Sequence, residues 1–177
     1  MRHHFQSEQW VPFPIEHVFL FFADPENLPR LMPRWQRARI EKMTLVPPPS
    51  ASAADPLLAG AGSRITLSFR AFPFPPIRLR WTAEIADFVW NDHFSDLQTR
   101  GPFAYWLHRH TVESATREDP SGRFLQGTLI RDDVTYQIPF EPLGGIAAPF
   151  MKGQLHSIFA YRQTQAMNLL SESYPND

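Results

Sequence analysis

Three side chains that could do chemistry alternate along one predicted strand. Trp106, His108 and His110 are spaced two residues apart, so in an extended chain they leave the same face. Imidazoles titrate near neutral pH and serve as acids, bases or hydrogen-bond donors. On a concave, unfilled face these three side chains would line a cavity. The alternative, which we favour from the sequence, is that this face is packed or that the imidazoles meet solvent or acids.

Two histidines at this spacing can also share a metal ion. The sequence identifies no third ligand, so it predicts no metal and no other cofactor. The catalytic residues, if there are any, stay unknown at this stage. The candidates are His108, His110 and Arg162.

Arg162 occupies an apolar position of the predicted last helix. A buried guanidinium needs a partner, because an unpaired charge in a core costs several kcal/mol. It could hold a carboxylate or enolate of a ligand, pair with an acid of the sheet, or extend to solvent at the edge of the helix face. We favour an acid as the partner. The candidate acids are Glu113, Asp132 and Asp133.

Aromatic residues make up 14% of the chain, and fifteen of them are phenylalanine. Such residues more often fill a core than line a pocket, although small-molecule sites are also rich in them. The abundance favours a mixture of solid core and pocket wall. The residues that we assign to ligand contact are Phe69, Trp81, Trp106, His108, His110, Tyr136, Ile158 and Arg162.

Composition and missing motifs exclude several classes of function. The net charge of -1 argues against nucleic-acid binding, which needs a basic surplus. Cysteine is absent, which excludes disulfide scaffolds, thiol nucleophiles and cysteine-ligated metals. The chain has no dinucleotide loop, Walker loop, Gly-x-Ser-x-Gly elbow or His-Glu-x-x-His motif. No apolar run approaches the length of a membrane span, so we expect a cytoplasmic protein without stable membrane insertion.

The elements that must position these side chains follow from periodicity. An opening strand over 3–11 ends at Pro12, and two short helices follow, the second with Asp24 as N-cap. A period of two then predicts further strands within 37–45, 64–70, 77–85, 94–99, 103–116 and 124–138. A stripe at helical spacing over 151–170 predicts a long amphipathic helix against the sheet, with Gly144-Gly145 as a turn before it.

Two loops have recognisable chemistry. Asp119-Pro120-Ser121-Gly122 predicts a tight turn, because proline fixes one φ angle and glycine supplies a positive one. The Pro/Ala-rich stretch 47–62 predicts a loop insertion and not a domain boundary, since strand signals resume at once. We therefore interpret residues 1–177 as a single α+β domain.

The order of elements resembles the helix-grip fold of the START and birch-pollen-allergen-like proteins, the SRPBCC superfamily. Local sequence carries the resemblance: Phe22 to Leu28 near the start, and Gly101-Pro102-Phe103 with Trp106, His108 and His110 later. Asp133-Val134, Tyr136 and Pro139, with Phe159-Ala160-Tyr161-Arg162, resemble its cyclase/dehydrase-type members. The resemblance implies a curved antiparallel sheet of about seven strands around a long C-terminal helix. It also implies a cavity for an apolar or amphipathic molecule between them.

Three functional hypotheses follow, and the sequence leaves them open. The leading one is binding of a small hydrophobic or amphipathic molecule, such as a lipid, quinone or polyketide-like compound, in that cavity. The alternative is a cyclase/dehydratase-like enzyme that uses the same cavity, although fold likeness alone does not establish a reaction. The third is a partner-binding module similar to a chaperone co-factor. The sequence does not decide between a monomer and a dimer.

Overall fold

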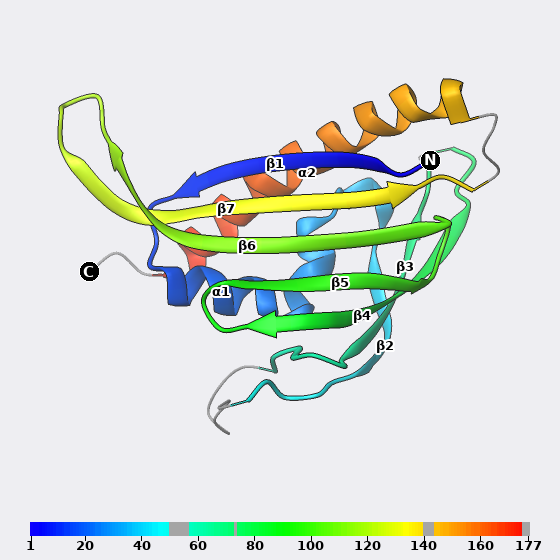
Figure 1. The fold of residues 1–177 in the computed structure, drawn as a ribbon, viewed down its shortest axis with the longest axis horizontal. Coiled ribbons are helices and arrows are strands. Elements are labelled where there is room, and N and C mark those ends of the chain that lie inside the picture. The colour runs from blue at the N-terminus through cyan, green and yellow to red at the C-terminus, as the bar shows by residue number, and fades with distance from the viewer. Residues whose placement is uncertain (50–56, 73, 140–143, 175–177) are drawn as a thin grey trace.

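The computed structural model describes residues 1–49, 57–72, 74–139 and 144–174. Its seven strands form one antiparallel sheet in the order β1-β7-β6-β5-β4-β3-β2 (Figure 1). The strands are β1 (His3–Val11), β2 (Arg39–Thr44), β3 (Arg64–Arg70), β4 (Arg78–Val89), β5 (His93–Arg100), β6 (Tyr105–Glu118) and β7 (Phe124–Gln137). The helices are α1 (Ile15–Ala23), the 3-10 helices η1 (Pro25–Leu31) and η2 (Arg34–Gln36), and α2 (Gly144–Ser173).

The expected fold is confirmed, with a curved sheet that packs against the long last helix. Both α1 and α2 lie on the same face of this sheet (Figure 1). Gln163 fixes the middle of α2 to the edge strand β1. Its side-chain amide donates to Ser7 Oγ at 2.7 Å and to the Glu8 carbonyl at 2.9 Å.

Irregular pairing accompanies the curvature of the sheet. The register of β4 against β5 shifts between Thr82 and Ala83 and again between Ile85 and Asp87. Such shifts insert an unpaired residue, which bends the strand and increases its twist. The bent sheet turns alternate side chains of β5, β6 and β7 toward the helices.

Two helix predictions need correction. The second short helix is a 3-10 helix because Pro29 lies inside it and has no N–H for the α-helical hydrogen-bond pattern. Its predicted cap is confirmed, since the Asp24 carboxylate accepts from the Glu26 N–H at 2.9 Å. The predicted turn at Gly144-Gly145 is wrong, because α2 already begins at Gly144. Glycine disfavours a helix by only about 1 kcal/mol relative to alanine, so a glycine pair does not exclude a helix start.

The turn between β6 and β7 is confirmed. Gly122 has a φ of 82°. The carboxylate of Asp119 accepts from the Ser121 N–H at 2.8 Å and from the Arg123 N–H at 3.0 Å. The Ser121 hydroxyl donates to the same carboxylate, and this bond together with the two backbone bonds lowers the pKa of Asp119 to about 2. Of the loop insertion, residues 50–56 lie outside the described residues, while Leu58 and Ala59 are buried in the core.

The core between helices and sheet has two parts. The α1 cluster includes Phe19 and Phe94 with Ala166 and Leu170 from the C-terminal half of α2. The Tyr136 cluster lies at the N-terminal half of α2. Its buried members are Phe5, Trp106, Val134, Tyr136, Leu155 and Phe159. Among the described residues, no helix is long and apolar enough to cross a membrane.

Candidate functional site

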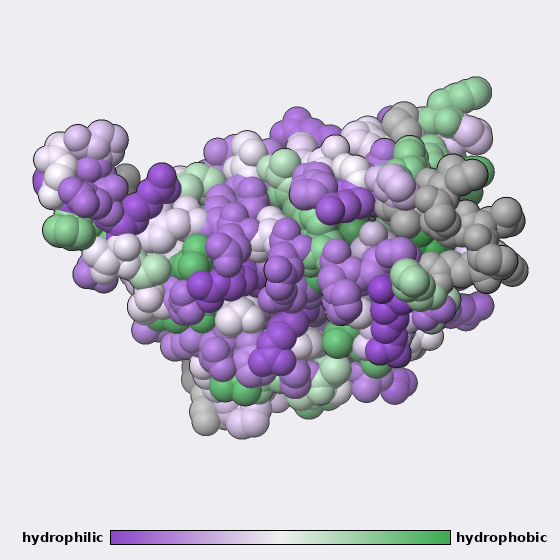
Figure 2. Space-filling model, turned by 45° about the horizontal axis from the view of Figure 1, so that its top comes forward, coloured by the Kyte–Doolittle hydropathy of each residue, from purple (hydrophilic) through white to green (hydrophobic). Residues whose placement is uncertain are grey.

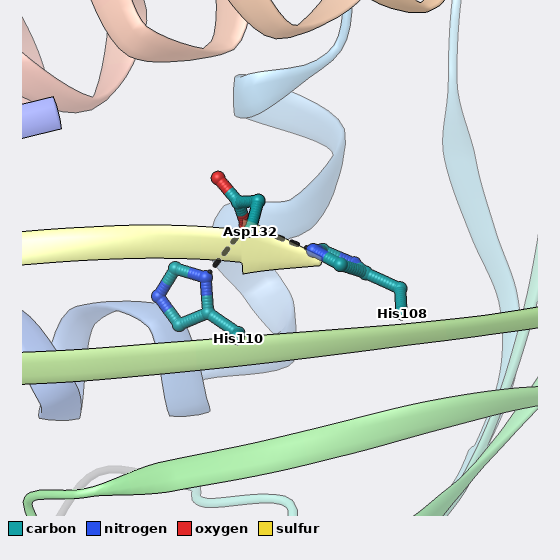
Figure 3. Close-up of side chains that lie close together, drawn as sticks. All are labelled: His108, His110 and Asp132. Carbon is teal, nitrogen blue, oxygen red and sulfur yellow. Dashed lines mark hydrogen bonds and ion pairs between the residues drawn. The ribbon is translucent and has the colours of Figure 1, made fainter. Parts of the chain in front are cut away.

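A row of acids and imidazoles crosses strands β5, β6 and β7 on the face that α2 covers. His108 Nε2 and His110 Nδ1 each lie 2.8 Å from the same oxygen, Asp132 Oδ1 (Figure 3). On the other side, His108 Nδ1 lies 3.1 Å from Asp96 Oδ2. Across the sheet, the Asp96 carboxylate is therefore followed by the His108 imidazole and the Asp132 carboxylate. The His110 imidazole is the second ring bonded to Asp132.

Strand register explains this arrangement. On β6, His108 pairs with Asp96 of β5, and His110 pairs with Asp132 of β7. Side chains of residues directly opposite each other project from the same face of a sheet. The predicted common face of Trp106, His108 and His110 is confirmed, and all three are buried. Asp133 leaves the other face, where it accepts a hydrogen bond from Gln6, so the two adjacent acids do separate as expected.

The two histidines differ in charge state although they share one carboxylate. Burial lowers the pKa of His108, but the hydrogen bonds and charges of Asp132 and Asp96 outweigh burial and raise it to about 9. Burial lowers the pKa of His110, and the charges of Arg162 and His108 lower it further, against the influence of Asp132. At neutral pH, His108 is therefore an imidazolium and His110 a neutral imidazole.

Asp132 remains ionised despite its burial. Burial raises the pKa of its carboxyl group, but the charge of Arg162 and the hydrogen bonds from both imidazoles hold it well below the usual range. An ionised Asp132 accepts the Nδ1–H of His110. The Nε2 of His110 then carries the lone pair, a tautomer assigned from this hydrogen bond.

Two buried polar atoms of the site have no hydrogen-bond partner among the described residues. They are His110 Nε2 and Arg162 Nε. Both side chains contact the ring of Phe22: the His110 ring centroid lies 4.2 Å from it, and the Arg162 guanidinium carbon 5.1 Å. The site therefore offers one acceptor and one donor beside the same aromatic ring.

The predicted partners of Arg162 are resolved in part. Glu113 lies on the opposite face of the sheet and pairs with Arg131 at 2.7 Å. Asp132 is the acid whose pKa the charge of Arg162 lowers, although no ion pair within 4.0 Å joins the two. The direct pair with an acid of the sheet that we favoured is therefore not formed among the described residues, and Arg162 influences Asp132 only through space.

The apolar site candidates separate into two groups. Trp106 and Tyr136 are buried in the Tyr136 cluster, and Trp81 packs against it with a ring distance of 4.9 Å to Trp106. Phe69 lies further along, 6.3 Å from Trp81. Ile158 is half-buried on α2, next to the buried Phe159.

Sequence reasoning missed three contributors. Asp96 was not selected because only the β5–β6 register reveals that it faces His108. Phe22 belongs to α1, and Phe5 belongs to β1, where its ring lies 4.9 Å from Phe159. Alternation could have placed Phe5 on the inner face, but no local signal predicts which rings it meets.

The aromatic rings below α2 touch one another in this structure. Besides the Trp81–Trp106 contact, the rings of Phe103 and Trp106 are 4.9 Å apart. A separate groove of about 590 Å³ lies beside the C-terminal half of α2, lined by η1, η2 and residues such as Tyr161 and Gln165. None of the predicted ligand contacts lines this groove.

The curved sheet gripping a long helix, with polar groups on the covered face, defines a helix-grip protein of the SRPBCC superfamily. A family model described as "Polyketide cyclase / dehydrase and lipid transport" matches residues 11–158. The chain therefore belongs to this family, whose members bind small hydrophobic ligands.

Solved structures agree with this fold. Ara h 8.0201 is 16% identical, with a TM-score of 0.57 and 95% and 99% of the two chains covered. Protein CV1439 from Chromobacterium violaceum is 14% identical, with a TM-score of 0.61 and 98% of both chains covered. Protein Ms6760 from Mycobacterium smegmatis is 15% identical, with a TM-score of 0.60 and coverage of 97% and 92%. Identities this low establish the fold alone. No curated protein matches the chain.

Proposed function

We propose that this protein binds an amphipathic small molecule, of the lipid, quinone or polyketide-like classes, between the sheet and the N-terminal half of α2. The observation that carries the proposal is the pair of buried polar atoms without partners, His110 Nε2 and Arg162 Nε. A buried polar group without a hydrogen bond costs about 1–3 kcal/mol, so each such atom calls for a missing partner. A ligand group that reaches both atoms would supply it.

The two atoms specify the polar end of the ligand. Arg162 Nε–H donates, so it needs an oxygen acceptor. His110 Nε2 accepts, so it needs an O–H or N–H donor. Phenols, enols and protonated carboxylic acids meet both needs with one or two oxygens.

The apolar end of the ligand would meet the Tyr136 cluster. Four of its six buried members are aromatic, and half-buried side chains such as Trp81 and Met151 surround it. Apolar surface lies at the end of the molecule where α2 begins (Figure 2). The exposed side chains there include Phe150, which is 57% exposed. This end supports entry of an apolar molecule beneath the start of α2.

Matched probe pairs test the proposal. Emodin, a hydroxylated anthraquinone, and palmitic acid are titrated into the folded protein by intrinsic tryptophan fluorescence, each beside its methylated counterpart. Loss of a hydrogen bond to a charged group weakens binding by about 10- to 100-fold. We therefore expect at least one parent compound to bind that much more tightly than its methyl ether or ester.

Variants locate the binding site. Arg162→Gln is expected to remove most of the preference for the parent compound and to leave the methylated one unchanged. Arg131→Gln is the matched control, because Arg131 lies on the opposite face and pairs with Glu8 and Glu113. The proposal fails if none of the four compounds binds the folded protein. It also fails if the preference survives in Arg162→Gln.

A further inference from the structure

The two imidazoles that converge on Asp132 Oδ1 also form the donor set of a metal centre. We propose that His108, His110 and Asp132 bind a first-row divalent metal ion of the Fe2+ to Zn2+ series. This proposal does not depend on the organic ligand proposed above, because it is carried by protein atoms alone. With a metal ion on Nδ1 of His110, its Nε2 carries the proton and donates instead of accepting. The sequence identified two of these donors and lacked the third, which the β6–β7 register supplies.

The two distances to Asp132 Oδ1 suit this assignment. One donor atom from each residue lies within 4.8 Å of the others, and all three residues are buried. Metal bonds to nitrogen and oxygen are about 2.0–2.2 Å long, so two ligands at a right angle are about 3 Å apart. Both nitrogen-to-Oδ1 distances are 2.8 Å. A metal ion could therefore replace the two bridging protons after ring rotations that also bring every pair of donor atoms to within about 4.4 Å, twice the length of a metal–ligand bond.

Asp96 supplies the outer support that metal-bound histidines need. A histidine ligand usually donates its second ring N–H to a carboxylate, which fixes the ring and its tautomer. His108 Nδ1 lies 3.1 Å from Asp96 Oδ2, so its Nε2 is directed toward Asp132.

The donor types select the kind of ion. Two imidazoles with one carboxylate suit zinc, iron, cobalt or nickel, whereas magnesium and calcium prefer oxygen ligands throughout. Three protein ligands leave coordination positions open, as in catalytic and not structural zinc sites. The ion, Arg162 and two carboxylates give a net charge of about +1, since both histidines are then neutral. An anion such as hydroxide or a carboxylate would therefore favour an open position.

Metal titration of the organic-ligand-free protein is the primary test. Protein treated with a chelator and shown to be folded by circular dichroism is titrated with Zn2+ in competition with a chromophoric chelator. We expect one tightly bound ion per chain. The Co2+-loaded protein should show visible absorption bands and X-ray absorption from imidazole ligands. A folded wild-type protein that binds none of Zn2+, Co2+, Ni2+ or Fe2+ would overturn the proposal.

Variants separate this site from other histidines. His110→Ala and Asp132→Asn are expected to lose the stoichiometric ion, and Asp96→Asn to weaken its binding by about 10- to 100-fold. His93→Ala is the matched control. His93 lies on β5 and also has a carboxylate oxygen 2.8 Å away, from Asp92. The double variant His3→Ala/His4→Ala controls for the adjacent pair near the N-terminus.

Two results besides absent binding would contradict the proposal. One is an ion that persists in both His110→Ala and Asp132→Asn, and the other is an ion lost in a control variant. If either site variant does not fold, the X-ray absorption spectrum of the Co2+-loaded wild-type protein tests the proposal instead, through the presence of imidazole ligands. A Co2+ spectrum without imidazole ligands would contradict the assignment.

Discussion

The two ends of α2 cover very different cores. Among the residues that the structure describes, the α1 cluster has seventeen buried members and the Tyr136 cluster has six. Phe19 in the α1 cluster is fully buried, and its ring lies 5.2 Å from Phe88 and 6.1 Å from Phe94. The second cluster is mainly aromatic, and three of the eight predicted ligand contacts, Trp81, Trp106 and Tyr136, belong to it or pack against it.

The polar row lies where the two clusters meet. His110 contacts Phe22 and Phe94 on the side of the α1 cluster, whereas His108 contacts Phe159 of the Tyr136 cluster. The difference in cluster size suggests different roles for the two halves of α2. The C-terminal half, on the α1 cluster, stabilises the fold, and the N-terminal half, on the Tyr136 cluster, can open. Large packed clusters resist opening, while local openings occur where buried apolar contacts are few.

Truncating a phenylalanine in each cluster should give the largest effects. Phe19→Ala is expected to lower the free energy of unfolding by about 3–5 kcal/mol, because it leaves a cavity among packed rings. Phe159→Ala should cost clearly less, since the smaller cluster around it can collapse, but it should weaken emodin or palmitate binding. Chemical denaturation measures both. Equal losses of unfolding free energy in Phe19→Ala and Phe159→Ala would contradict different roles for the two halves of α2.

Substituting the adjacent acids of β7, Asp132 and Asp133, should give the next largest change in stability. Asp132→Asn leaves the His108 imidazolium without its principal partner and should destabilise the protein by about 3 kcal/mol in metal-free buffer. Asp133→Asn, on the other face, is the matched control and should change stability by no more than about 0.5 kcal/mol. Thermal unfolding of the two variants side by side tests this prediction. The prediction is wrong if Asp132→Asn and Asp133→Asn have the same melting temperature.

Hydrogen exchange should show a smaller, local difference. With a bound ligand, amides around Leu155 and Phe159 are expected to gain protection, because the ligand stabilises the closed position of this half of α2. Amides around Ala166 and Leu170 should change little, since they already belong to the larger cluster. Mass spectrometry of peptides from the two halves measures the contrast. Uniform protection along α2 would argue against opening at one end.

The smallest effect is expected on the solvent face of the sheet. Arg131 lies 2.7 Å from both Glu8 and Glu113, and all three side chains are partly exposed. Solvent and salt screen such pairs, so Arg131→Ala should change the melting temperature least of this series. The change should shrink further in 1 M NaCl. A loss comparable to that of Asp132→Asn would contradict the ranking.

Much of the fold could be predicted from local signals. The alternation of Trp106, His108 and His110 predicted their common face, and the Asp119 turn followed from residues that demand particular φ angles. The start of α2 could not be predicted in this way. Glycine disfavours a helix by only about 1 kcal/mol relative to alanine and does not forbid one, so the Gly144-Gly145 pair does not fix where α2 begins.

The candidate site divides along the same line. Residue order alone determined that two imidazoles share a face and that Asp132 and Asp133 point apart, because side-chain alternation is a property of an extended backbone. Only the tertiary structure decided that Asp96 and Asp132 are the acids that reach them, and that Arg162 acts from α2. Pairing register and helix placement depend on contacts between residues far apart in the chain, which no local period encodes.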